Sequence, residues 1–231
     1  MKITRTSKGD VEMKITRTSI ALALASSIVG CGTAMPTAQS GFLSSYLSLI
    51  PGADKATNNL RTTVAIDPSR ISLGEIEWRV QPNSDISREE QAALLAQLKE
   101  GLQQRVRELP AAPNGRPTRL RAAITRVETV SPTLNTVVAL LMIVPLDRGG
   151  AAVEIEAVDT ESGKQLAALH LGYFAPLSEL RARFSKLGPA EVAVRKAAEE
   201  FAALLQPVGT AHLPADDGLE LAPQELTSTS R

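Results

Sequence analysis

The chain has 231 residues, of which 43% are hydrophobic and 22% charged, and its formal net charge is zero. This length suits one folded domain with unstructured ends, and the hydrophobic content excludes an intrinsically disordered protein. The first 30 residues hold five basic and two acidic residues, so the remainder carries a net charge of −3. A mildly acidic remainder lacks the basic surface that nucleic-acid-binding proteins need, and we expect no nucleic-acid partner.

The first 30 residues have the pattern of a secretory signal peptide. The heptapeptide MKITRTS occurs at 1–7 and again at 13–19, which indicates that Met13 is the true start or an alternative one. Lys14 and Arg17 supply a positive segment, and residues 20–29 supply an apolar run. That run has about the length of a signal-peptide core and is far shorter than the ~20 residues of a membrane-spanning helix. We predict that residues 1–30 are a signal peptide.

The only cysteine, Cys31, directly follows Ile28-Val29-Gly30, and this arrangement resembles the lipobox of bacterial lipoproteins. In that signal the thiol is alkylated with diacylglycerol, the chain is cut before the cysteine (here between Gly30 and Cys31), and the new amine is acylated. A buried free cysteine is the alternative, but small and polar residues, not a periodic segment, follow Cys31. Two or more acyl chains anchor a protein to a membrane almost permanently. The residue after the cysteine is Gly32 and not Asp, and by resemblance to enterobacterial sorting signals this favours the outer membrane over retention in the inner membrane.

Residues 31–59 are rich in small and polar residues and are expected to form a lipidated tether. An apolar stretch interrupts the tether, with hydrophobic residues at helical spacing, and we expect it to dock on the domain: Phe42, Leu43, Tyr46, Leu47 and Leu49. Residues 60–207 are expected to form a single domain. The polar segment 208–231 is expected to be a disordered tail.

Within the domain, hydrophobic periodicity predicts strands at 60–67 and 71–80, separated by Asp67-Pro68. A helix is predicted over 87–109, with Ser87 and Glu90 as its capping box and Pro110 beyond its end. A strand over 118–130 and a hairpin over 151–174 follow, and the hairpin turns at Ser162-Gly163. A short helix at 177–187 and a long one at 188–207 complete the domain. The order ββαβββα predicts an α+β fold, a largely antiparallel sheet with two main amphipathic helices on one face.

Several of these segments carry motifs of one bacterial lipoprotein family. A Gly-Phe-Leu with a nearby Tyr stands at 41–46, a valine-rich strand before Asp-Pro at 64–68, and Arg-Ala-Ala-Ile-Thr at 121–125. Gly-Ala-Ala-Val-Glu-Ile-Glu follows at 150–156, and Asp-Thr-Glu-Ser-Gly at 159–163. Over most of residues 41–206 the chain resembles the family of lipoproteins catalogued as domain of unknown function 3313. The resemblance implies a lipid-anchored protein of the cell envelope and implies no particular activity.

A search for catalytic and metal-binding motifs finds little. His170 and His212 are the only two histidines, which excludes a multi-histidine metal site. The chain has no Gly-x-Ser-x-Gly, His-Glu-x-x-His or Gly-x-Gly-x-x-Gly motif. We therefore predict a protein that is not an enzyme, with no catalytic residues, no metal and no cofactor.

Glu154 and Glu156 stand on the same face of a predicted strand, close enough for paired-carboxylate catalysis. The favoured interpretation is a solvated sheet face, on which the two carboxylates form cross-strand pairs with the nearby arginines Arg119, Arg121 and Arg126.

The segment LNTVVALLMIVPL at 134–146 contains ten consecutive apolar residues from Val137 to Leu146, counting Pro145. A run of this length is too short to cross a membrane, and a buried core segment is the favoured interpretation. The functional alternative is an exposed patch that docks a partner or a second subunit. Its docking residues would be Val138, Leu140, Leu141 and Ile143.

Three functional hypotheses remain. The first is a non-catalytic envelope adaptor or accessory subunit, anchored at the outer membrane through the lipid on Cys31. It would bind a periplasmic protein partner or a second copy of itself, through its sheet or the 134–146 segment. The second is a module that binds a small ligand or lipid between sheet and helices. The third, and the least favoured, is a hydrolase that uses Glu154 and Glu156.

Overall fold

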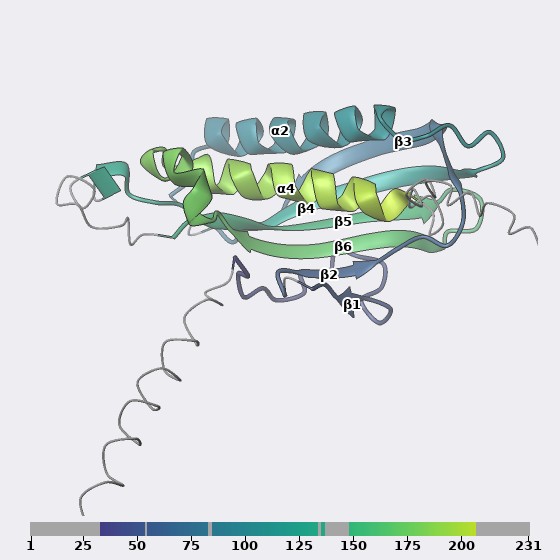
Figure 1. Ribbon diagram of the computed structural model, residues 1–231, viewed down its shortest axis with the longest axis horizontal. Helices are drawn as coiled ribbons and strands as arrows, with labels where there is room; N and C mark the ends of the chain where they lie inside the picture. The colour runs from purple at the N-terminus through teal and green to yellow at the C-terminus, as the bar shows by residue number, and fades with distance from the viewer. Residues whose placement is uncertain (1–32, 54, 83–84, 134, 137–147, 207–231) are drawn as a thin grey trace, which may run out of the picture.

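The computed structural model describes residues 33–53, 55–82, 85–133, 135–136 and 148–206. These residues form three layers: two long helices, a six-stranded sheet, and an N-terminal segment on the other face of the sheet (Figure 1). We call this N-terminal segment, residues 33–49, the strap. The strands are β1 (Ile50–Pro51), β2 (Thr57–Leu60), β3 (Ile66–Trp78), β4 (Arg116–Glu128), β5 (Gly150–Asp159) and β6 (Gln165–Phe174). The helices are α2 (Arg88–Arg107), the 3-10 helix η1 (Leu177–Phe184) and α4 (Gly188–Leu205).

The strands lie in the order β1-β2-β6-β5-β4-β3. Only β3 and β4 are parallel, because helix α2 carries the chain back from the end of one to the start of the other. The other neighbouring pairs are antiparallel. The predicted α+β fold with a largely antiparallel sheet is confirmed, and α2 and α4 lie together on one face, as expected (Figure 1).

Helix α2 begins where the sequence indicated. The Ser87 hydroxyl accepts a hydrogen bond from the Glu90 backbone N–H, and the Glu90 carboxylate accepts one from the Ser87 N–H. This reciprocal capping box satisfies two N–H groups that a helix start otherwise leaves without partners. Leu94, Leu98 and Leu102 recur on the buried side of the helix. The predicted helix is therefore confirmed together with its cap.

The main core lies between the helices and the sheet. Alternate residues of β4, β5 and β6 point toward the helices and are almost fully buried: Leu120, Ala122, Ile124, Val153, Ile155, Ala157, Ala167, Leu169 and Leu171. Helix α4 contributes Phe201 and a row of alanines that allow it to pack closely on the sheet. Pro189 stands in its first turn, as predicted. Small aliphatic residues thus build a core that contains few aromatic rings.

The hairpin of β5 and β6 is confirmed, and Asp159 fixes its turn. Its carboxylate accepts hydrogen bonds from the backbone N–H groups of Glu161 and Ser162 and from the Arg116 side chain. Burial alone would raise the pKa of Asp159, but these donors outweigh it and lower the pKa to about 2. Gly163 completes the turn at a φ of 70°, which a side chain would strain.

The first predicted strand is wrong in position. Residues 61–65 lie outside any strand, β2 precedes them, and β3 begins at Ile66 and passes through Asp67-Pro68 without a break. Pro68 is tolerated because β3 is an edge strand whose pairing with β4 shifts register between Ile66 and Ile71. The turn signal in the sequence marks an irregularity within one strand.

The packed part of the chain also reaches further toward the N-terminus than residue 60, where we placed the start of the domain. Thr33 and Met35 already form backbone hydrogen bonds to β6, and Phe42 and Leu43 are buried. Of the apolar stretch that we expected to dock, Phe42 and Leu43 are buried and Tyr46 and Leu49 pack beside them, whereas Leu47 is 98% exposed. Among the described residues, no helix is long and apolar enough to cross a membrane. The predicted signal peptide and the predicted tail lie outside the described residues.

Candidate functional site

The face of the sheet opposite the helices carries two carboxylates that the strap covers. Glu154 and Glu156 alternate along β5 with the core residues Val153, Ile155 and Ala157, so their side chains point away from the helices. Both glutamates have no exposed surface. Since a buried carboxylate must be compensated by hydrogen bonds or a counter-charge, the residues around each one define the site.

Glu154 holds the strap at Ser40 and Tyr46. Its Oε1 accepts a hydrogen bond from the Ser40 backbone N–H at 3.0 Å. Its Oε2 accepts bonds from the Ser40 hydroxyl and the Tyr46 hydroxyl, each at 2.7 Å. Three donors from two strap residues therefore converge on one buried carboxyl group and tie the strap to β5.

Glu156 repeats the arrangement one step further along the strand. The backbone N–H and the hydroxyl of Ser44 donate to it at 2.8 and 3.0 Å. Gln165 of β6 donates at 2.9 Å, and the Arg121 guanidinium of β4 donates at 2.9 Å and supplies the counter-charge. We call Glu154, Glu156, Ser40, Ser44 and Tyr46 the carboxylate latch.

The strap is folded tightly between its two serines. Gly41 adopts a φ of 74°, and the Tyr46 hydroxyl accepts hydrogen bonds from the N–H groups of Phe42 and Leu43 at 3.1 and 3.3 Å. The guanidinium of Arg121 lies 4.9 Å from the centre of the Phe42 ring and that of Arg79 lies 5.2 Å from it, which are cation–π distances. Arg121 therefore contacts both the strap ring and the Glu156 carboxylate.

Small residues on the sheet make room for the strap. Phe42 and Leu43 pack on Ala123 of β4 and Ala168 of β6, which form a second, minor core. A Cβ atom at Gly172 would lie 2.3 Å from the Thr37 Cγ2 and 2.4 Å from the Met35 carbonyl oxygen. The strap crosses β6 at this point because position 172 has no side chain.

His170 is the remaining polar group beneath the strap. It stands directly across from Glu154 in the β5–β6 register, with its Nε2 3.8 Å from the Glu154 carboxylate and its ring edge-on to Tyr46. Burial lowers the pKa of His170, and the nearby Glu154 opposes this effect only in part. Burial and the hydrogen bond to Glu154 raise the pKa of Tyr46. Both groups are therefore neutral near neutral pH, while Glu154 is held by hydrogen-bond donors.

This geometry corrects the expectation of a solvated sheet face, because the strap excludes water from both glutamates. The expected cross-strand pair between Arg121 and Glu156 is present. Arg119 is exposed, and Arg126 forms its ion pair with Glu128 of its own strand. A carboxylate that acts as a general acid, base or nucleophile must reach its substrate. In this arrangement the oxygens of Glu154 accept bonds from the strap, and those of Glu156 accept bonds from the strap, Arg121 and Gln165, so both glutamates fasten the strap to the sheet.

Two hollows lie beside these elements. A polar groove of about 620 Å³ runs between the strap and the ends of β3 and β4, lined by residues 37–40, 79–81 and 125–127. A smaller and more apolar hollow of about 190 Å³ lies between β3 and α2, and its lining includes Ile71, Leu73, Leu102, Val106 and Leu120. Within the described part of the chain, no group of three or more His, Cys, Asp or Glu side chains is placed to hold a metal ion.

The other residues singled out by the sequence lie outside the described residues: Gly30, Cys31, Val138, Leu140, Leu141 and Ile143. Sequence reasoning did not identify Ser40, Ser44 or His170 as partners of the glutamates. The sequence signal that could have indicated these contacts is the presence of two family motifs. The Gly-Phe-Leu and Tyr motif at 41–46 contains Ser44 and Tyr46, which donate hydrogen bonds to the two glutamates of the Glu-x-Glu strand.

Comparison with known proteins agrees with the motifs. A family model described as "Protein of unknown function (DUF3313)" matches residues 38–201. No curated protein matches the chain significantly. Among solved structures, PelC from Paraburkholderia phytofirmans, a dodecamer, is 11% identical, with 65% of this chain and 98% of that chain covered and a TM-score of 0.38. A "putative lipoprotein" from Caulobacter crescentus CB15 is 12% identical, with 60% of this chain and 92% of that chain covered and a TM-score of 0.26.

Proposed function

This chain belongs to the DUF3313 family of proteins of unknown function, and we propose that it is a lipid-anchored, non-catalytic adaptor or accessory subunit of the cell envelope. The observation that carries the proposal is the place of the lipobox relative to the folded domain. Cys31 stands two residues before Thr33, whose carbonyl oxygen accepts a hydrogen bond from the Phe174 N–H at 2.7 Å. A lipid on Cys31 would therefore be attached almost directly to the sheet. We assign this anchor to the periplasmic side of the outer membrane because Gly32, and not Asp, follows the cysteine.

The closed carboxylate latch supports a role in binding over a role in catalysis. Glu154 and Glu156 were the strongest catalytic candidates in the sequence, and the strap separates both from solvent. A protein that presents a surface needs a rigid body. Two strap serines that each donate two hydrogen bonds to a carboxylate would supply that rigidity on the face opposite the helices.

The partner surface in this proposal remains the segment that contains Val138, Leu140, Leu141 and Ile143. The sheet itself is a less suitable surface than expected, because helices cover one of its faces and the strap covers much of the other. Leu141→Asp should abolish partner binding and leave the domain folded. The matched control is Leu47→Asp, since Leu47 is 98% exposed in the strap and tolerates a charge. Unfolding of the Leu141→Asp variant alone would assign residue 141 to the core and contradict the docking role.

A module that binds a small ligand is the second candidate, because a hollow does lie between the sheet and helix α2, where that function requires it. Its volume of about 190 Å³ is below the ~300–1,000 Å³ of typical ligand pockets. Leu102→Trp would fill this hollow. If the second candidate is right, a ligand that co-purifies with the protein should be lost in this variant.

The proposal is tested on the full chain, expressed in a bacterium that processes lipoproteins and grown with an alkyne-labelled fatty acid. The wild-type protein should carry the label and enter the membrane fraction, and Cys31→Ala should do neither. Mild crosslinking of whole envelopes should then capture one defined protein with the wild type and not with Cys31→Ala. An unlabelled wild-type protein would refute the anchor, and a labelled protein that captures only copies of itself would replace the adaptor with a homo-oligomer.

A further inference from the structure

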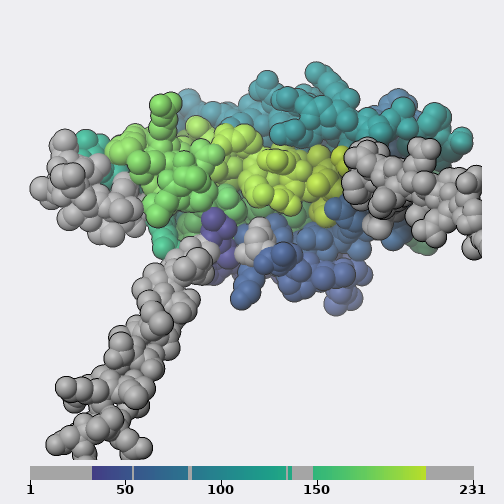
Figure 2. All heavy atoms as spheres, in the orientation of Figure 1, coloured from purple at the N-terminus to yellow at the C-terminus, as the bar shows by residue number. Residues whose placement is uncertain are grey.

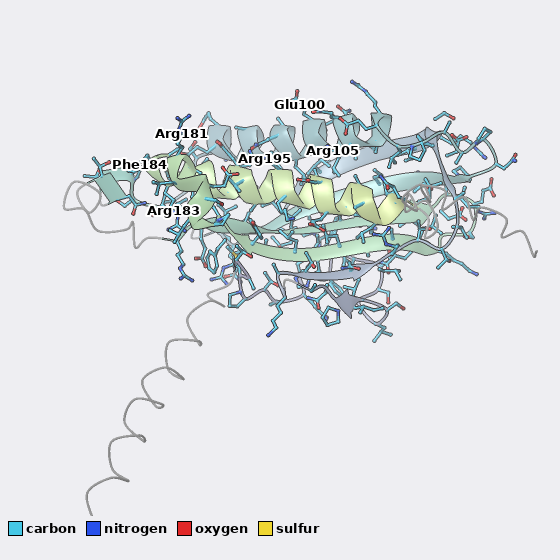
Figure 3. The ribbon with its side chains drawn as sticks, viewed as in Figure 1. Glu100, Arg105, Arg181, Arg183, Phe184 and Arg195 are labelled. Carbon is cyan, nitrogen blue, oxygen red and sulfur yellow. The ribbon has the colours of Figure 1, made fainter. Side chains whose placement is uncertain are left out.

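Three apolar side chains of helix η1 are exposed to solvent. Leu177, Leu180 and Phe184 are 56%, 43% and 42% exposed, although each is large enough to contribute to a core. Arg181, from the same helix, is also exposed. We call these four residues the η1 patch. Figure 3 shows Arg181 and Phe184 at one end of the molecule, beyond the start of helix α4.

The η1 patch lies at the end of the sheet where the strap begins. Ala34 pairs with Tyr173, the Phe174 N–H donates to Thr33, and η1 starts three residues after Phe174. In the space-filling view the first residues of the strap, in purple, accordingly lie beside green residues of the later part of the chain (Figure 2). The last strand of the sheet thus connects the start of the strap to the patch.

The distance from the anchor to this end is short. A residue spans at most about 3.6 Å of extended chain, so Cys31 lies within about 7 Å of Thr33. If Cys31 carries a lipid, as the proposed function holds, the bilayer surface must lie against this end of the domain. The following inference therefore rests on the proposed function and adds a second contact to it.

The charges around the patch suit a bilayer surface. Arg148, just before β5, is exposed. It lies near η1, because Gly149, the residue after it, accepts a hydrogen bond at its carbonyl from the N–H of Ala175, which is two residues before η1. The acidic residue of η1, Glu179, is engaged by Arg195 of α4 at 3.4 Å. Exposed arginines beside exposed leucine and phenylalanine are the composition of segments that lie in the headgroup region, where the charge meets phosphate and the apolar groups enter the acyl boundary.

The patch is held in place by buried contacts. The Arg183 side chain is 4% exposed and donates to the Ala175 carbonyl at 3.0 Å, while its own carbonyl accepts a bond from the Asn135 side chain at 2.8 Å. At Gly188 a Cβ atom would lie 2.2 Å from the Ala182 carbonyl, so η1 packs directly on the start of α4. The apolar side chains are therefore presented outward by a fixed support.

We propose that the η1 patch is a membrane-contact surface: Leu177, Leu180 and Phe184 insert into the bilayer that holds the lipid of Cys31, and Arg181 faces its phosphate groups. The domain then has two points of attachment and a defined orientation. The end with η1 and the strap start faces the membrane, and the opposite end, with the β5–β6 turn, faces away from it.

The test uses the lipidated full chain in vesicles of phosphatidylethanolamine and phosphatidylglycerol. Cys31 is the only cysteine and is consumed by the lipid, so a second cysteine can carry an environment-sensitive fluorophore. Three matched variants place it at exposed serines: Ser178→Cys and Ser185→Cys beside the patch, and Ser162→Cys in the distant β5–β6 turn. Phospholipids with a nitroxide on the upper acyl chain serve as quenchers.

The labels at 178 and 185 should shift to shorter wavelength and lose most of their fluorescence to the nitroxide lipids, and the label at 162 should do neither. In the background of Leu177→Ser, Leu180→Ser and Phe184→Ser, with all three side chains exposed in the wild type, the quenching at 178 should be lost while the protein stays on the vesicles. Vesicle-bound protein with unquenched labels at 178 and 185 would overturn the membrane contact and leave the anchor intact.

Two further outcomes separate the remaining explanations. A label that is shielded from water but not quenched by nitroxide lipids would mean that protein covers the patch, and energy transfer between labelled copies would identify a second copy as that protein. Either result overturns the proposal. A chain that takes up no fatty acid and does not stay on the vesicles would refute the proposed function itself, and with it the reason for a bilayer at this end.

Discussion

At the scale of single residues, the carboxylate latch depends on two glutamates that are buried inside the protein. Removing a buried carboxylate from water is costly, and the cost is recovered only if donors surround it. The two glutamates divide these donors: Glu154 receives the Ser40 and Tyr46 bonds, and Glu156 receives Ser44, Gln165 and Arg121. The strap is therefore attached through hydrogen bonds to charged groups as well as through the burial of Phe42 and Leu43.

Glu154→Gln should lower the free energy of unfolding by about 2 kcal/mol. The neutral amide accepts weaker hydrogen bonds from Ser40 and Tyr46, and its NH₂ group would face hydrogen-bond donors instead of acceptors. Urea unfolding followed by circular dichroism measures the change. Glu75→Gln on the exposed side of β3 is the matched control and should have almost no effect. Equal stability of the two variants would contradict the latch.

His170 should make stability depend on mildly acidic pH. Burial holds the pKa of His170 below its usual value of 6.5, so the unfolded chain binds a proton at a higher pH than the folded chain. The free energy of unfolding is therefore highest above about pH 6.5, the usual pKa of histidine, and decreases as the pH falls toward the lowered pKa of the folded state. The groups that face His170 are Glu154 and Tyr46, and Tyr46 stays neutral throughout this range.

Urea titrations at a series of pH values check this dependence, with His170→Gln as the comparison. The wild type should lose stability between pH 7 and pH 5 more steeply than the variant, since Gln does not titrate. Parallel profiles would mean that His170 does not become charged on unfolding in this range.

At the scale of elements, the sequence predicted those whose signals are local. Ser87 and Glu90 marked the start of α2 because both halves of a capping box lie within four residues. The β5–β6 hairpin was predictable because its turn residues and its alternation are adjacent in the chain. The boundary of β3 was not, because whether Asp67-Pro68 ends a strand depends on the position of that strand at the edge of the sheet.

The hydrogen bonds between the strap and the two glutamates were missed for a related reason. Alternating glutamates on a strand predict a polar environment, and neither composition nor spacing distinguishes water from hydrogen-bond donors supplied by a distant segment. The strap residues that donate hydrogen bonds to Glu154 and Glu156 are 108 to 114 positions away in the chain. Only a joint interpretation of the 41–46 motif and the 150–156 motif could have brought them together.

Gly172→Ala should detach the first half of the strap from β6. Its Cβ would lie within 2.4 Å of the Met35 carbonyl oxygen and the Thr37 side chain, a clash with backbone that cannot be relieved by a rotamer change. A cost of about 1 to 3 kcal/mol is expected, in the range of overpacked sites. Limited proteolysis should cut the variant within residues 33–40 under conditions that leave the wild type intact. If the strap of the variant resists proteolysis as well as that of the wild type, β6 and the strap can move apart enough to fit the new methyl group, and the strap stays bound to the sheet.

At the scale of the whole molecule, the protein is a sheet covered on both faces, by helices on one side and by the strap on the other (Figure 1). The strap supplies much of the second cover, together with the charge compensation that Glu154 and Glu156 require. Without the strap, Ala123 and Ala168 would be exposed to water, and the packing of Phe42 and Leu43 on this face would be lost. The N-terminal segment is therefore a structural layer of the domain.

A chain that begins at residue 33 should fold and remain monodisperse, since it retains the strap. A chain that begins at residue 50 should be poorly soluble or melt at a much lower temperature, because it loses the packing of Phe42 and Leu43 on the sheet together with the strap hydrogen bonds and leaves Ala123 and Ala168 uncovered. Thermal melts and size-exclusion chromatography of the two chains provide the comparison. Equal melting temperatures would contradict a structural role for the strap.

The separation between the strap and its partners also sets an order in time. A chain emerges from its N-terminus, so Ser40 is made 114 residues before Glu154. Closing so long a loop costs entropy that is recovered only when the β5–β6 hairpin is already present as a template. The strap therefore cannot form its bonds to Glu154 and Glu156 until β5 has been made, and its first residues cannot pair with β6 until that strand follows. If Cys31 is lipidated as proposed, the processing enzymes would meet residues 33–40 before β6 is available to pair with them.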